Sequence, residues 1–176
     1  GMFCMLNIAS CTTPNLEPSP QEELREVVFH ADWAPETKTV LQEDGSVWWS
    51  PGDEINLFPQ FYSSEYGYYT HPLKFVSTNK EASPSTEFVY NGDDFREAEE
   101  YVAVFPYNSE NIAFKSSHIN VTIPTVQTAP CGSFDHKAFV SVAISKDENL
   151  QFRNICGGVK FSVSQDGIKE VSFKNL

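Results

Sequence analysis

The chain has 176 residues, of which 40% are hydrophobic and 14% aromatic, enough for one domain with a substantial core. Lys and Arg together number 12 and Asp and Glu together number 24, so the formal net charge at pH 7 is −12. This charge would repel a polyanion, which excludes nucleic acid as the expected partner, and no apolar run approaches the roughly 20 residues that span a bilayer as a helix.

The N-terminus carries features of a bacterial export signal. An apolar stretch from Met2 to Ser10 ends in small residues, and Ile8-Ala9-Ser10-Cys11 resembles a lipobox. That resemblance implies cleavage before Cys11 and attachment of lipid to its thiol, although no Lys or Arg precedes the stretch. The alternative is that Met2–Ser10 is an ordinary buried strand.

Residues 12–25 are polar and rich in proline, a composition typical of an extended tether. A lipid anchor followed by a polar tether would hold a domain away from a membrane. We therefore expect a signal remnant and lipobox at 1–11, a tether at 12–25 and a β-domain at 26–176.

The remaining chain alternates short apolar segments with turn residues. The segment Val27–Trp33 places Phe29 and Trp33 on one face of a strand. Further strands are expected at Val47–Trp49, Glu54–Phe58, Leu73–Val76, Glu87–Tyr90, Tyr101–Phe105, His118–Ile123, Ala138–Ile144, Leu150–Ile155, Val159–Val163 and Glu170–Phe173. Because Tyr101–Phe105 is apolar at nearly every position, we expect it to be buried on both faces. The pattern predicts an all-β sandwich or barrel.

Turn residues and one helical candidate complete the expected elements. Asp44-Gly45, Pro51-Gly52 and Asp166-Gly167 are turn dipeptides. The segment Asp93–Tyr101 could form one or two helical turns, with Asp93 or Asp94 as the N-cap.

The sequence contains no pattern of a catalytic or metal site. There is no Gly-x-Ser-x-Gly, no phosphate-binding glycine loop, no His-Glu-x-x-His and no Cys-x-x-Cys. Asp53-Glu54 and Asp93-Asp94 lack the spacing of a calcium loop, so turn and cap roles are favoured. The histidines fall in separate segments, at His30, His71, His118 and His136, and we expect no metal site.

Two cysteines lie in the expected β-domain. An export route through an oxidising compartment would allow a disulfide between Cys131 and Cys156. The alternative, two free thiols packed as small apolar groups, is favoured because a large sandwich needs no covalent staple.

Four segments, in this order along the chain, resemble motifs of the fimbrillin-like proteins of Bacteroidetes. They are Lys38-Thr39 with Val47-Trp48-Trp49-Ser50-Pro51-Gly52-Asp53-Glu54-Ile55-Asn56-Leu57-Phe58, then Tyr101–Tyr107, Ile123–Gln127 and Leu150–Phe161. Trp48 and Phe58 are expected to be core anchors on either side of the Pro51-Gly52 turn, where Asp53 accepts backbone donors. None of these residues is a reactive group.

The resemblance implies a transthyretin-like, Greek-key β-sandwich of about seven to ten strands, with at most one or two short helices and a second domain to follow. It implies a lipoprotein of the outer membrane, at the cell surface or in a fimbrium. The implied partners are fimbrial subunits, surface proteins or glycans, and the implied role is adhesion or a fimbrial accessory, anchor or tip function. No cofactor and no enzymatic activity are expected.

In polymerising members of that family an Arg-specific protease removes the first strand, and Arg25 is the one Lys or Arg before Lys38. Cleavage at Arg25 would release residues 12–24, which are too rich in proline to form a core strand. Arg25 is therefore the candidate processing site, but we do not expect a polymerising stalk subunit of that type.

A glycan-binding module of a surface nutrient-uptake system is the alternative function. It predicts exposed rings at Tyr66, Tyr68, Tyr69 or Trp49 on which sugars stack. The other interpretation of the three tyrosines is a loop folded over the end of the core. An enzyme would require a set of convergent carboxylates or a nucleophile that no motif predicts.

Overall fold

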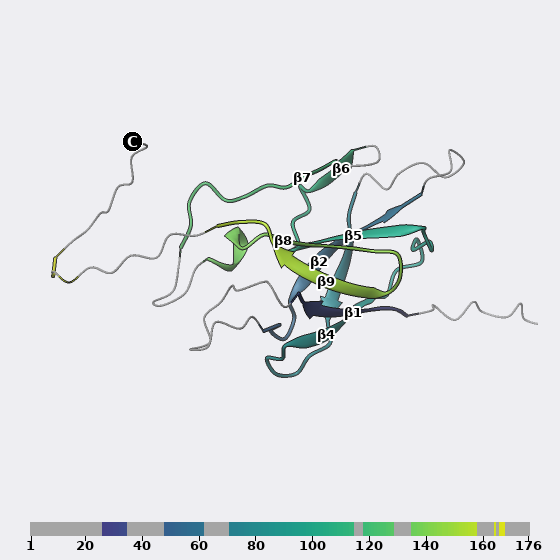
Figure 1. The fold of residues 1–176 in the computed structure, drawn as a ribbon, viewed down its shortest axis with the longest axis horizontal. Coiled ribbons are helices and arrows are strands. Elements are labelled where there is room, and N and C mark those ends of the chain that lie inside the picture. The colour runs from purple at the N-terminus through teal and green to yellow at the C-terminus, as the bar shows by residue number, and fades with distance from the viewer. Residues whose placement is uncertain are drawn as a thin grey trace, which may run out of the picture.

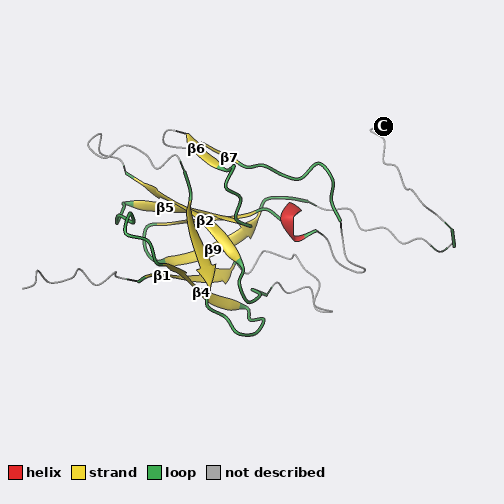
Figure 2. Cartoon of the chain, turned by 180° about the vertical axis from the view of Figure 1, so that it is seen from behind, coloured by secondary structure: helices red, strands yellow, loops and turns green. Residues whose placement is uncertain are grey.

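A computed structural model of the chain describes residues 26–34, 48–61, 71–114, 118–128 and 135–157, together with residues 164, 166 and 167. In this part of the chain the regular structure is β, except for one 3-10 turn, η1, at His136–Ala138 (Figure 2). The strands are β1 Val27–Trp33, β2 Glu54–Gln60, β3 Leu73–Ser77, β4 Ser85–Tyr90, β5 Glu100–Phe105, β6 Ile112–Phe114, β7 His118–Asn120, β8 Ser141–Ser145 and β9 Asn149–Asn154.

Seven strands are hydrogen-bonded into a closed barrel in the order β1-β4-β3-β2-β5-β8-β9. Every neighbouring pair is antiparallel except β1 and β9, which run parallel and close the barrel. The order β1-β4-β3-β2 is a Greek key, because three consecutive strands form a meander and the first strand returns beside the last. The expected all-β, Greek-key sandwich-type architecture is confirmed.

Aromatic rings fill the interior of the barrel. The indoles of Trp33 and Trp49 stack with their centroids 4.5 Å apart, and Phe105 and Phe152 meet the Trp49 ring edge-on at 5.2 and 5.1 Å. Phe29, predicted on the inward face of β1, contacts other core rings in the same edge-on manner and is fully buried. Such pairs add about 0.5–1.5 kcal/mol each beyond the buried area alone.

A second apolar cluster lies on the outer face of the barrel, under the two-stranded sheet β6–β7. The buried members of this cluster are Phe58, Val104, Ala113 and Val140. The β6–β7 hairpin packs over this side, away from β1 and β4 (Figure 1). Strand β5 thus contributes to both clusters, which confirms its predicted burial on both faces.

The Pro51-Gly52 turn forms as predicted. Gly52 has φ +75°, a conformation that favours glycine, and the Asp53 amide donates to the Ser50 carbonyl at 3.1 Å. The Asp53 carboxylate accepts the Ser50 amide at 2.7 Å. Burial raises the pKa of Asp53, and the bond from the Ser50 amide opposes that rise. The turn leads the chain directly into β2.

The expected role of Trp48 as a core anchor is wrong, and Trp49 takes it instead. Trp49 is 0% exposed, whereas Trp48 is 44% exposed. The backbone of Trp49 exchanges hydrogen bonds with Ser83 at 2.7 and 2.9 Å, which fixes the local strand-like pairing. Because neighbouring side chains point to opposite faces there, Trp48 projects outward.

The expected helix at Asp93–Tyr101 does not form. Phe95 packs against Phe29 at 6.1 Å and stacks on Tyr101 at 6.2 Å, and the Ala98 amide donates to the Tyr101 hydroxyl at 3.0 Å. A helix of one or two turns has little stability of its own, so these contacts with the barrel decide the conformation.

Several predicted strands are shorter than expected. Of His118–Ile123 only β7 is a strand, and Ala138–Ile144 begins in η1, so β8 starts at Ser141. In the segment Val47–Trp49 the described pairing is a single bridge at Trp49, and β6 was not predicted. The Asp44-Gly45 turn and the strands Val159–Val163 and Glu170–Phe173 lie outside the described residues.

The two neighbouring tryptophans provide a stability test of the core. We expect Trp49→Ala to lower the free energy of unfolding by about 3–5 kcal/mol, because it removes a fully buried ring from a packed core. The matched change Trp48→Ala removes an exposed ring and should alter the free energy by no more than about 0.5 kcal/mol. Urea denaturation followed by tryptophan fluorescence measures both, and equal losses would contradict this account of the core.

Candidate functional site

Most residues singled out from the sequence lie outside the described residues. These are Cys11, Arg25, Tyr66, Tyr68, Tyr69 and Cys131. Cys156 is described: its thiol is free, and its half-buried side chain packs against the second cluster. The lipid, processing, tyrosine-loop and disulfide assignments therefore remain predictions. Trp49, the fourth ring offered as a sugar platform, is fully buried, so that part of the glycan hypothesis is wrong.

The histidines and paired acids have local partners. His30 Nδ1 lies 3.5 Å from Glu87 Oε1 across the β1–β4 pair, and the Tyr90 hydroxyl donates to Asp94. Within the described ranges, no group of three or more His, Cys, Asp or Glu side chains could hold a metal ion. In the same residues, no helix is long and apolar enough to cross a membrane.

Two fully buried asparagines join β2 to the loop that follows β5. Asn56 donates from Nδ2 to the Asn108 carbonyl at 3.0 Å, and its Oδ1 accepts the Asn108 amide at 3.1 Å. The same oxygen accepts Asn111 Nδ2 at 2.6 Å. Asn111 Oδ1 in turn accepts the Thr122 amide at 3.0 Å. We call this set of bonds the amide lock. It connects the loop after β5 to β2 and to the start of the segment after β7, through buried and part-buried hydrogen bonds.

The amide lock frames a concave site, which we call the loop pocket. Its volume is about 330 Å³, at the lower end of the range for small-ligand sites. Its lining residues are Pro106, Tyr107, Asn108, Ser109, Asn111, Val121, Thr122, Pro124, Lys137 and Val140. The site is thus built from three separate parts of the chain, two of which are joined by the amide lock and by the pairing of β6 with β7.

Neighbouring charges around the loop pocket are already engaged. Lys74 pairs with Glu54 at 2.5 Å and lies 5.2 Å from the centre of the Tyr107 ring. Asp135, which precedes η1, accepts the backbone amides of Thr128 and Lys137 at 2.8 and 2.9 Å. These two bonds lower the pKa of the Asp135 carboxyl. Glu54 and Asp135 therefore interact with neighbouring groups of the protein.

A polar hollow of about 460 Å³ lies over β1 and β4. Its lining residues are His30, Ala31, Asp32, Thr78, Asn79, Ser83, Ser85, Thr86 and Glu87. Beneath it the hydroxyls of Ser77 and Thr86 share a buried hydrogen bond of 2.8 Å. The hollow is wide and shallow, and its carboxylates give it an acidic character.

The outer face of β5 and β8 leaves an apolar strip open, formed by Val102, Val142, Ile144 and Ile155. Val102 lies opposite Ile144 in the strand register, and the Ile155 amide donates to the Val140 carbonyl at 3.0 Å. Ile144 is 65% exposed and Ile155 is 57% exposed. We call this surface the open strip.

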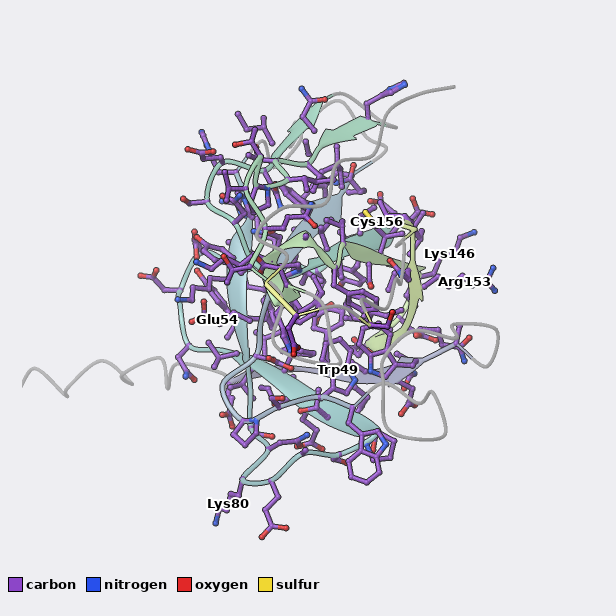
Figure 3. The ribbon with its side chains drawn as sticks, turned by 90° about the vertical axis from the view of Figure 1, so that its left-hand side faces the viewer. Trp49, Glu54, Lys80, Lys146, Arg153 and Cys156 are labelled. Carbon is purple, nitrogen blue, oxygen red and sulfur yellow. The ribbon has the colours of Figure 1, made fainter. Side chains whose placement is uncertain are left out.

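Two cations border the open strip. Lys146 follows β8, and Arg153 on β9 lies opposite Val142. Their side chains project on the same side of the barrel, below Cys156 (Figure 3). This side combines exposed apolar groups with two cationic side chains, and the exposed acids Asp147 and Glu148 lie beside Lys146.

Neither the amide lock nor the loop pocket was anticipated from the sequence. One signal was present: Asn56 interrupts the apolar run Ile55–Phe58 in a strand that has to be buried. A buried amide needs partners, which indicates a side-chain network, but the identity of the partners depends on the fold.

The amide lock makes a stability prediction. We expect Asn56→Ala to lower the free energy of unfolding by about 2–4 kcal/mol, because the part-buried Asn108 amide and the buried Asn111 Nδ2 lose their acceptor. Asn120→Ala, an exposed amide on β7, should change it by less than about 0.5 kcal/mol. Chemical denaturation measures both, and hydrogen exchange at Asn108 should accelerate in Asn56→Ala alone. If the two variants have equal free energies of unfolding, the amide lock does not stabilise the fold.

Comparison of the chain with protein-family models, with curated proteins and with solved structures found no match.

Proposed function

We propose that the chain is a non-enzymatic, lipid-anchored protein of the bacterial cell surface, with a fimbrillin-like, transthyretin-like domain. Its role is cell adhesion, or that of an accessory, anchor or tip component of a fimbrium in the outer membrane. The observation that carries the proposal is the open strip, in which Ile144 and Ile155 remain more than half exposed. Contiguous exposed apolar groups flanked by charge are typical of surfaces that contact other proteins.

The positions of the motif residues are consistent with this proposal. Trp49 and Phe58 are buried, Pro51-Gly52 forms the turn into β2, and Tyr101–Phe105 forms most of β5. Each of these residues sets the architecture and none presents a reactive group. The resemblance to fimbrillin-like proteins therefore involves determinants of the fold, as expected for a family of adhesion and assembly proteins.

A second candidate function is glycan binding at the cell surface, as in a nutrient-uptake system. The loop pocket favours it, because polar side chains and an apolar wall meet there on a pre-ordered loop. Both candidates share the lipid anchor and the non-enzymatic character, and they differ in whether the open strip or the loop pocket meets the partner.

The lipid anchor can be tested with a labelled fatty acid supplied to bacteria that express the chain with its export signal. We expect the label in the wild type and in Cys4→Ala, since Cys4 lies in the stretch that is removed. It should be lost in Cys11→Ala, which has no thiol at the first mature residue. Label that persists unchanged in Cys11→Ala refutes the anchor.

The adhesive role of the open strip can be tested with Ile144→Glu, counting bacteria that display the chain on epithelial monolayers. A carboxylate buried at the contact without a partner should weaken attachment about tenfold or more, which corresponds to about 1.4 kcal/mol. Ala82→Glu adds the same charge to an exposed position between β3 and β4, away from the strip, and it should leave attachment within about twofold. If both changes reduce attachment equally, the contact with the partner does not lie on the open strip.

A further inference from the structure

The loop pocket differs in charge from the rest of the molecule. None of its ten lining residues is an Asp or a Glu, and one of them is Lys137. In the whole chain the acids outnumber Lys and Arg by 24 to 12. A concave site without acids on such a chain is electrostatically distinct from its surroundings, and the lysine makes it attractive to an anion.

Six of the ten lining residues of the loop pocket have polar side chains, and one of them, Lys137, can only donate hydrogen bonds. Lys137 forms no ion pair within the described ranges, although the Asp135 carboxylate is close enough to interact with its charge. Tyr107 adds a hydroxyl to the lining. Ser109 and Thr122 add hydroxyls at the rim. An ammonium group has three donors and no acceptor, so a ligand that satisfies this site must itself accept hydrogen bonds at a negatively charged group.

The other side of the loop pocket is apolar. Val121 and Val140 belong to the second cluster, and Pro106 and Pro124 complete this wall. Val140 is almost fully buried, so it forms a fixed floor rather than a flexible flap. A ligand with one apolar face and polar edges fits this arrangement, and a sugar ring is a ligand of that kind.

The amide lock holds the loop in place before any ligand arrives. Asn108 and Asn111 line the pocket and are bonded to Asn56 on β2. Ordering a loop during binding reduces affinity, so a loop that is already ordered by buried bonds favours binding of a small ligand.

We propose that the loop pocket binds a carboxylate-bearing monosaccharide, a sugar acid. Its carboxylate pairs with the ammonium of Lys137, its hydroxyls exchange hydrogen bonds with Tyr107 and Thr122, and its apolar ring face lies against Val121 and Val140. The inference rests on the glycan-binding candidate function and specifies its ligand class, and it does not depend on the lipid anchor.

Titration of the full chain, followed by backbone amide NMR shifts at Val121, Thr122 and Lys137, tests the ligand class. Glucuronate is the probe, glucose is the neutral counterpart, and cyclohexanecarboxylate carries the same charged group on a ring without hydroxyls. We expect glucuronate to bind at least tenfold more tightly than either. If glucose binds as tightly as glucuronate, the carboxylate does not contribute to binding. If cyclohexanecarboxylate binds as tightly as glucuronate, the sugar hydroxyls do not contribute. Either result overturns the proposal.

Matched lysine variants test the location of the ligand. Lys137→Met should weaken glucuronate binding tenfold or more, whereas Lys146→Met, with the same loss of charge outside the pocket, should change it less than twofold. Tyr107→Phe should weaken binding without changing the unfolding midpoint. Equal effects of the two lysine variants overturn the proposal, because they indicate attraction by overall charge.

The sugars also separate failure of this inference from failure of the candidate function. Suppose that 10 mM glucuronate does not change the NMR shifts of the pocket amides, but neutral glycans on an array bind the chain. The sugar-acid proposal is then wrong, and the glycan-binding function is supported. If no glycan binds at all, both fall. The adhesive role of the open strip is unaffected in either case.

Discussion

Strand β5 has apolar side chains on both of its faces, and this constraint requires two packed layers. Its inner face presents Tyr101, Ala103 and Phe105 to the barrel core, and its outer face presents Val102 and Val104. A closed barrel satisfies the inner face alone. The hairpin β6–β7 and the segment after it are needed to cover the outer face, and they bury Val104 completely but Val102 only in part.

The two layers are stabilised by different interactions. The barrel core depends on ring packing: within the described part of the chain the indole nitrogens of both Trp33 and Trp49 have no hydrogen-bond partner. Stacked and edge-on ring contacts around Trp49 therefore provide the interactions of this layer that the structure shows. The outer layer is smaller, and its strands β6 and β7 have three residues each. Its position depends both on the second apolar cluster and on the directional hydrogen bonds of Asn56 and Asn111.

This division explains what the sequence could predict. Strands of the barrel alternate or are apolar throughout, as in Val27–Trp33 and Tyr101–Phe105, and local patterns are sufficient to find them. Which of Trp48 and Trp49 is buried depends on a β-bridge between Trp49 and Ser83, which are 34 positions apart. No local sequence pattern encodes that bridge. The expected capped helix is absent for a similar reason, because the Phe95 ring reaches the core from the loop before β5 and stacks on Tyr101 of β5. The loop pocket was the least predictable feature, since it is assembled by the amide lock from residues far apart in the sequence.

The placement of the three surfaces bears on how an anchored domain would meet a partner. The chain enters the barrel through β1, which lies with β4 on the side away from the β6–β7 hairpin (Figure 1). The acidic hollow is on the β1–β4 side, whereas the open strip and the loop pocket both border the second cluster. If residues 12–25 are the tether, the membrane attachment enters beside the acidic side. Because β1 also pairs with β9, and the His30 amide donates to the Glu148 carbonyl at 2.8 Å, that tether would also enter next to the β8–β9 turn that carries Lys146.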